Sequence, residues 1–408
     1  MPRFTDRFTG LPPYPLATIP QRKRELLARG IDVIDLGAGD ADLAPPQAAI
    51  DALADVGTTP ALSRYGFGLG LPAFRTAAVD WMQKRFGHRF DPITEVVPLL
   101  GSKEGLSHLA LAYVQKGDTT IVPDPGYNAY RGGTQLADGE PYLYPITPRT
   151  NFLVELDEIP DDIMRRARIL YLNYPNNPTG AIAPLDYLAR VVERCRERDI
   201  ILVYDNPYAE MTFDGYVAPS IFDVEGARDV AIEFHSMSKT FNMTGWRCGW
   251  ALGPARVIAA AAAIQSHATS NVNSVTQKAV TAALEGPQAS VVAMRDRRPT
   301  MTPVMIATAT PASRGGRSAG GTIHSKTVDI AATRTSTPPI RATRLRIPSG
   351  LKRESAAPIV SMGTRSAVPT ATAAAALSAR WAPGTSSVAR TIPSGVSRRR
   401  RVCSVVAS

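Results

Sequence analysis

The first 294 residues alternate between short apolar runs, bounded by turn residues, and longer segments with helical periodicity. The short runs predict strands over residues 96–100, 119–123, 168–173, 200–205, 230–235 and 249–253. The longer segments predict helices over residues 72–86, 103–114, 184–198, 254–266 and 274–285. Because strands and helices alternate, we expect an α/β fold with a mixed, mainly parallel sheet between helices. Functional side chains should then gather at the carboxyl ends of the strands.

This pattern ends near Arg295, where Thr, Ser, Ala, Pro and Arg begin to dominate. From 301 to 408 there are 16 Lys and Arg residues but only two acids, Asp329 and Glu354, which gives +14. The whole chain carries +10, so the remainder is about −4. Three interpretations are open: a disordered basic tail, a nucleic-acid-binding arm, or a shift of reading frame near residues 294–299. We favour the frame shift, because the change falls where a folded domain should continue and a shifted frame of a GC-rich gene tends to encode Arg, Ala, Pro, Ser and Thr. The arginines are accompanied by a single aromatic residue, Trp381, which argues against the arm.

Length and composition indicate the number of domains and the cellular compartment. A chain of 408 residues is long enough for two domains. The cysteines Cys195, Cys248 and Cys403 are scattered, which argues against a disulfide framework or a metal site and indicates a reducing cytoplasm. The N-terminal segment lacks the apolar core of a signal peptide, and no apolar run approaches ~18 residues. We therefore expect a cytoplasmic protein with no membrane and no nucleic-acid partner.

The segment HSMSKTFNMTGWRCGW, residues 235–250, begins at the end of the strand predicted over 230–235 and contains Lys239. Burial between an apolar strand and an aromatic, glycine-containing segment would lower the pKa of Lys239 and prepare its amine to form an imine. Ser236, Ser238 and Arg247 are suited to holding a phosphate nearby. This spacing indicates a lysine that bonds to a phosphorylated cofactor.

Three further strand ends carry matching side chains. Asp205 ends the run ILVYD and is suited to keep a ring nitrogen protonated, with Tyr208 three residues later. In LNYPNNPTG, Asn177 can donate to a ring oxygen. In LLGSKEGL, the backbone N–H groups of Ser102 and Lys103 would open a helix and meet a phosphate.

Tyr127, in the segment DPGYNAY, is placed to stack on a cofactor ring. Taken alone, each of these residues is equally compatible with a cap, a turn or a surface position. Together they supply what pyridoxal 5′-phosphate needs: an amine, a carboxylate, donors to its ring oxygen, a stacking ring and an anion site.

In this order the segments resemble the class I/II aminotransferases of fold type I, the aspartate aminotransferase fold, over about residues 10–294. The resemblance implies that Lys239 bonds to the cofactor and then moves the substrate's Cα proton. It implies that Asp205 pairs with the ring nitrogen, Asn177 and Tyr208 bind the ring oxygen, and Tyr127 stacks. Ser102, Lys103, Ser236, Ser238 and Arg247 would hold the phosphate.

The resemblance also implies a homodimer, because Tyr65, in SRYGFGLG, matches a tyrosine that reaches the phosphate of the neighbouring subunit. Gly39, in LGAGDADLAPP, matches a glycine segment that closes over the substrate, and Tyr65 and Asn177 would also contact substrate. The segments from Gly101, Asn173 and Ser236 are most similar to LL-diaminopimelate aminotransferases. They imply lysine biosynthesis with 2-oxoglutarate as amino acceptor.

Other interpretations of this fold stay open: an alanine or aspartate aminotransferase, a carbon–sulfur lyase, a regulator that senses the cofactor, or an inactive, truncated product that retains part of the large domain. The expected domains are an N-terminal part of a small domain at 1–45, a large cofactor-binding domain at 46–294, and the basic tail at 295–408. That tail replaces the C-terminal part of the small domain, which in this family carries the arginine that binds the substrate α-carboxylate. Neither Arg344 nor Arg390 lies in a strand-like context, so the small domain is expected to be incomplete.

Overall fold

The computed structural model describes residues 2–12, 18–33, 41, 43–66 and 68–296. Gly39 and the basic tail from 297 onward, with Arg344 and Arg390, lie outside these described residues. The strands are β1 (Val96–Leu99), β2 (Thr119–Asp124), β3 (Glu140–Pro145), β4 (Ala167–Leu172), β5 (Ile201–Asp205), β6 (Ala231–Ser236) and β7 (Gly249–Leu252).

The helices, in chain order, are α1 (Asp6–Thr9), α2 (Ile19–Ala28), α3 (Gln47–Ala54), α4 (Pro72–Phe86), α5 (Ser102–Tyr113), α6 (Asn128–Leu136), α7 (Asp161–Arg166), α8 (Leu185–Arg198), α9 (Ala227–Val230), α10 (Met237–Thr240), α11 (Ala255–Ala268), α12 (Ser274–Glu285) and α13 (Ala289–Asp296).

Across the described ranges, the strands form one seven-stranded sheet in the order β1-β7-β6-β5-β4-β2-β3. All neighbouring pairs from β3 to β6 are parallel, whereas β7 is antiparallel to both β6 and β1. Two antiparallel pairings in succession leave β1 parallel to β6. The carboxyl ends of β1, β2, β4, β5 and β6 therefore meet at one edge of the sheet, which confirms the predicted mixed, mainly parallel arrangement.

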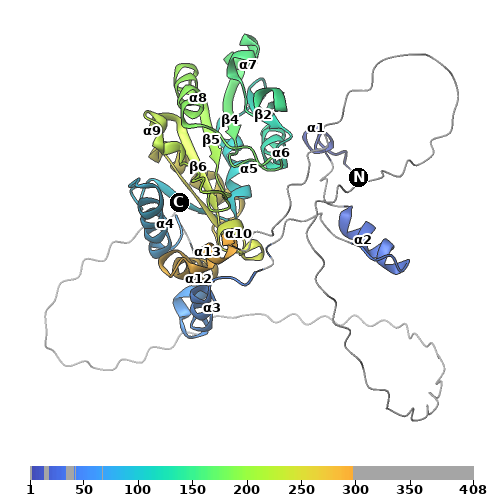
Figure 1. Ribbon diagram of the computed structural model, residues 1–408. Helices are drawn as coiled ribbons and strands as arrows, with labels where there is room; N and C mark the ends of the chain where they lie inside the picture. The colour runs from blue at the N-terminus through green and yellow to red at the C-terminus, as the bar shows by residue number, and fades with distance from the viewer. Residues whose placement is uncertain (1, 13–17, 34–40, 42, 67, 297–408) are drawn as a thin grey trace, which may run out of the picture. The chain divides into compact units, whose positions relative to one another are not determined.

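Both faces of the sheet are buried, because neighbouring residues of one strand point into different apolar clusters. In β5, Leu202 and Tyr204 belong to one cluster and Val203 to the other. The first cluster includes apolar residues of α4, α8 and α12, and the second includes those of α5, α6 and α11. The helices flank the strands in Figure 1. This burial on both faces explains why the strands are continuously apolar rather than alternating.

The predicted helices over 72–86 and 274–285 are α4 and α12, residue for residue. The sequence did not predict β3 or α6. β3 contains Pro141 and Pro145 and lies at the edge of the sheet, where a strand tolerates proline because one side needs no ladder hydrogen bond. α6 contains Gly132 and Gly133, which lower helix propensity. No helix in the described part of the chain is both long and apolar enough to cross a bilayer.

Candidate active site

The predicted site residues gather at the carboxyl edge of the sheet. Each predicted cofactor residue from Ser102 onward ends or follows a strand that ends there, except Arg247, which lies two residues before β7, whereas Tyr65 precedes all the strands. Ser102 and Lys103 open α5 after β1, Tyr127 follows β2, Asn177 follows β4, Asp205 and Tyr208 end and follow β5, and Ser236, Ser238 and Lys239 end and follow β6. The topology thus brings together residues that are up to 145 positions apart in the chain, from Ser102 to Arg247.

Asp205 is the last residue of β5, and its side chain is buried, with 4% of the residue exposed. Its Oδ2 accepts a hydrogen bond of 2.6 Å from the hydroxyl of Tyr130. Its Oδ1 is buried and has no hydrogen-bond partner among the described residues. Burial raises the pKa of Asp205 to about 7, against the lowering effect of the Tyr130 hydrogen bond. An unpaired buried carboxylate oxygen is costly, so this atom is suited to meet a protonated ring nitrogen.

A chain of amide contacts connects the ends of β4 and β5. The side-chain amide of Asn173 donates to the backbone carbonyl of Asp205 at 2.7 Å, and its Oδ1 accepts from the Asn177 N–H at 2.8 Å. Asn177 Nδ2 in turn donates to the Tyr208 hydroxyl at 3.1 Å. The two predicted ligands of a ring oxygen are thus brought together. Asn177 lies in the loop after β4, which ends at Leu172, and not at the strand end itself.

Two glycines, Gly101 and Gly249, leave an open space beside the first turn of α5, between the α5 backbone amides, Arg247 and the end of β6. We call this space the cradle. Gly101 precedes this helix with φ of +74°, and a Cβ there would lie 2.8 Å from Arg247 Nη2. Gly249 pairs with Leu99 on one side and Ser236 on the other. A Cβ at Gly249 would lie 3.0 Å from the Ser102 nitrogen. The space between the α5 amides, Arg247 and the end of β6 therefore depends on the absence of two side chains.

This cradle is electropositive. Arg247, which has φ of +54°, is held through Nη2 to the Leu100 carbonyl at 3.2 Å and through Nη1 to the Thr244 carbonyl at 3.1 Å. Burial and the charge of Arg247 lower the pKa of Lys103. The Lys103 ammonium lies 5.7 Å from the centre of the Tyr127 ring. Two cations and the N-terminus of a 12-residue helix together favour a bound anion.

Lys239 lies in α10 and is half-buried, between the buried residues Ser238 and Thr240. The Ser236 hydroxyl caps this helix by accepting from the Ser238 N–H at 3.2 Å. Tyr65 is 86% exposed, so its ring is not packed into the core of its own chain.

Sequence reasoning missed two residues that act on this site, Tyr130 and Asn173. Tyr130 is three residues after Tyr127, which places the two rings on one side of the α6 N-terminus, and this spacing was a usable signal. Asn173 directly follows a buried strand, but its contact with the Asp205 backbone depends on the pairing of β4 with β5.

Comparison with known proteins identifies the family of this site. The sequence profile described as "Aminotransferase class I and II" matches residues 31–307. This chain belongs to the class I and II aminotransferases. The LL-diaminopimelate aminotransferase of Desulforudis audaxviator is 48% identical over 296 residues, which are 72% of this chain and 76% of that protein. That of Moorella thermoacetica is 48% identical over 289 residues, 71% of this chain and 74% of that protein.

Solved structures of aminotransferases show the same fold. Substrate-bound BacF from Bacillus subtilis superposes with a TM-score of 0.70 at 30% identity. The superposed part is 72% of this chain and 75% of the BacF chain. An aspartate aminotransferase variant from Thermus thermophilus gives a TM-score of 0.67 at 28% identity, over 72% of this chain and 77% of its own. The chain therefore has fold type I.

As an aminotransferase of this family, the protein is a pyridoxal-phosphate-dependent enzyme that acts on amino acids and 2-oxo acids. The site fits this cofactor. The buried Asp205 Oδ1 lacks a partner that a protonated ring nitrogen would supply, and the glycine-lined cradle beside Arg247 has the space and charge for a phosphate.

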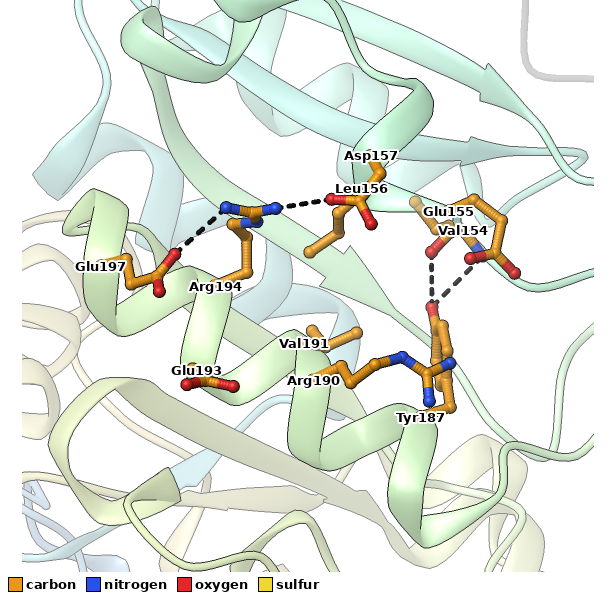
Figure 2. Close-up of a pocket in the computed structure, with 10 residues that line it drawn as sticks. All are labelled: Val154, Glu155, Leu156, Asp157, Tyr187, Arg190, Val191, Glu193, Arg194 and Glu197. Carbon is orange, nitrogen blue, oxygen red and sulfur yellow. Dashed lines mark hydrogen bonds and ion pairs between the residues drawn. The ribbon is translucent and has the colours of Figure 1, made fainter.

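A separate surface pocket of about 230 Å³ lies between α8 and the short 3-10 helix Leu156–Glu158. Figure 2 shows that its central cation, Arg194, is already shared between two acids. Arg194 pairs with Asp157 at 2.5 Å and with Glu197 at 3.1 Å. None of the predicted site residues lines this pocket, so we assign no part of the chemistry to it.

Proposed function

We propose that this aminotransferase moves an amino group between LL-2,6-diaminopimelate and 2-oxoglutarate. The observation that carries the proposal is the 48% identity to two LL-diaminopimelate aminotransferases over 296 and 289 residues, which are 72% and 71% of the chain. The aspartate aminotransferase structure is 28% identical, which favours the diaminopimelate assignment over the aspartate alternative. The place of the reaction would be lysine biosynthesis.

We propose the following contacts for the cofactor. Asp205 Oδ1 would receive the hydrogen of the ring nitrogen, Asn177 and Tyr208 would bind the ring oxygen, and Tyr127 would stack on the ring. The phosphate would be held by the backbone N–H groups of Ser102 and Lys103 and by Ser236, Ser238 and Arg247. Support comes from the chain of contacts Asn173–Asn177–Tyr208 and from the electropositive cradle around Arg247.

The proposed catalytic group is Lys239. Pyridoxal phosphate supplies an electron sink that makes the Cα–H bond of a bound amino acid acidic. The amine of Lys239 would take the proton from the substrate Cα and hold it for return. Its half-buried position in α10 limits the exposure of this lysine to solvent. Tyr127, over one face of the ring, would keep water from that face.

We further propose that the enzyme is a homodimer in the cytoplasm. The 86% exposure of Tyr65 supports the dimer, because most of this residue's surface lies outside the core of its own chain. Gly39 and Tyr65 would then contact substrate together with Asn177. The free thiols of Cys195 and Cys248, both buried, are consistent with a reducing compartment.

The test is an assay of glutamate formation from 2-oxoglutarate with LL-diaminopimelate, alanine or aspartate as donor. We expect LL-diaminopimelate to give the highest kcat/KM, and Lys239→Ala to lower it by at least about 10³-fold, as loss of a proton-transfer group does. Lys116→Ala, which removes an exposed lysine beyond the end of α5, is the matched control and should be unchanged. Faster turnover of alanine or aspartate would refute the substrate proposal. Pyruvate and ammonia from cystathionine without an acceptor would indicate a carbon–sulfur lyase.

A further inference from the structure

Tyr130, on α6, is fully buried and makes a direct contact with the carboxylate of Asp205. Its exposed fraction is 0%, and its hydroxyl donates to Asp205 Oδ2 at 2.6 Å. Burial, together with the charge of Asp205, raises the pKa of Tyr130 well above its ordinary value. The phenol therefore keeps its proton, and Tyr130 donates to Asp205 whenever that carboxylate is ionised.

Packing fixes the position of the Tyr130 ring. It stacks on Tyr171 of β4 with ring centroids 4.7 Å apart and planes at 15°. On another side it meets the edge of Tyr127 at 5.8 Å and 83°. A ring held by two aromatic neighbours cannot swing its hydroxyl away without repacking both contacts. One oxygen of Asp205 is thereby held, and only Oδ1 is left for another partner.

We propose that Tyr130 is a positioning residue for Asp205: its hydroxyl holds Oδ2, turns Oδ1 toward the cofactor ring, and keeps the carboxylate an acceptor. The inference rests on the proposed pairing of Asp205 with the ring nitrogen. It adds a reason for the pairing to work in this chain. Burial drives the carboxylate toward its neutral form, and a neutral carboxyl would no longer stabilise a protonated ring nitrogen; the Tyr130 hydrogen bond opposes that change.

The chain offers a matched pair of variants. Tyr130→Phe removes the hydroxyl that touches Asp205. Tyr171→Phe removes the hydroxyl of the stacked neighbour, which donates to the Leu106 carbonyl at 3.3 Å rather than to Asp205. Both variants retain the aromatic stack. Any difference between them reports on the contact with Asp205 rather than on the loss of a buried hydroxyl.

The first measurement uses the cofactor-free full chain: urea unfolding from pH 5 to 9, with Asp205→Asn as the reference without a titrating group. The unfolding free energy should change with pH as Asp205 titrates, and the pH at the middle of this change is the Asp205 midpoint. We expect Tyr130→Phe to raise this midpoint by roughly one pH unit, because the hydrogen bond to the charged form is lost. The second measurement is the dissociation constant for pyridoxal phosphate by equilibrium dialysis. It should rise about tenfold in Tyr130→Phe, while Tyr171→Phe leaves both quantities at the wild-type values.

If Tyr130→Phe behaves like Tyr171→Phe in both measurements, the proposal is wrong. If Asp205→Asn binds pyridoxal phosphate as tightly as wild type, the pairing of Asp205 with the cofactor fails, and the role of Tyr130 fails with it. If Tyr130→Phe does not fold, a ring-fluorinated tyrosine at position 130 replaces it. Its more acidic phenol keeps the shape and should move the Asp205 midpoint downward; an unchanged midpoint would overturn the inference.

Discussion

Asn173 donates its side-chain amide to the backbone carbonyl of Asp205, so the end of β4 holds the end of β5 in place at 2.7 Å. The same side chain accepts from the Asn177 N–H. We expect Asn173→Ala to destabilise the protein by about 1–3 kcal/mol, the cost of leaving buried polar groups unpaired. Urea unfolding measures this loss. Asn173→Asp would place a carboxylate oxygen against the Asp205 carbonyl inside the protein, so it should be at least as destabilising as Asn173→Ala. An Asn173→Ala protein of wild-type stability would contradict the assigned role.

Gly249→Ala should narrow the cradle beside α5. The added Cβ would lie 2.5 Å from the His235 carbonyl oxygen and 3.0 Å from the Ser102 nitrogen, and both are backbone atoms with little freedom to move. We expect a loss of about 1–3 kcal/mol in unfolding free energy, as overpacking usually causes. Weaker binding of pyridoxal phosphate should accompany it. Gly245→Ala is the control, because a Cβ there meets nothing within 4 Å; equal effects of the two variants would refute the prediction.

Asp205 should make the stability of the cofactor-free protein depend on pH. Its pKa is about 7 in the folded protein against an ordinary value of 3.8, so between these values the folded state holds a proton that the unfolded chain has released. The stabilisation is complete below about pH 4 and is lost as the pH rises through 7, a difference of roughly 4 kcal/mol. Urea unfolding should show that the unfolding free energy of wild type falls between pH 4 and 7, whereas that of Asp205→Asn lacks this fall. Parallel curves would contradict it.

Arg247→Ala should weaken cofactor binding more than Arg247→Lys does. Arginine offers a fork of donors, whereas lysine keeps the charge but binds a phosphate as a point charge. The fork is oriented in the protein by the Leu100 and Thr244 carbonyls. We expect a rise in the dissociation constant of roughly tenfold for lysine and more for alanine, measured by dialysis with pyridoxal phosphate. Competition by inorganic phosphate should weaken in the same order. Equal binding by all three proteins would exclude Arg247 from the phosphate site.

The coding DNA for residues 285–408 should contain an insertion or deletion near codons 294–299. The match to the family profile ends at residue 307, and about a quarter of each relative's length lies outside the aligned part. We expect another frame to encode strands, helices and an arginine for the substrate α-carboxylate. Translation of all three frames tests this. If the present frame is clean and no other frame restores that pattern, the basic tail is genuine, the chain lacks the usual arginine, and ordinary transaminase activity has to be demonstrated on the purified protein.

The sequence was sufficient to place the strands that form the centre of the sheet, because burial on both faces makes them uniformly apolar. The edge strand β3 escaped prediction because it is more exposed and contains two prolines. The cofactor residues were predictable where a motif is continuous, as in the segment around Lys239. The partners of Asp205 were not, because the Tyr130 hydroxyl reaches it only through the packing of α6 against the sheet. Pairing across strands leaves little trace in local sequence.

The place of β7 in the sheet has a consequence for the order of events on the ribosome. In the part of the chain that the structure describes, β1 pairs only with β7, which is synthesised about 150 residues later. The nascent chain must therefore carry β1 without a partner until residues 249–252 emerge, and only then can Gly249 complete the space beside the first turn of α5. All seven strands are nevertheless encoded before residue 294. A shift of the coding frame after that point therefore leaves all of these strands in the translated chain.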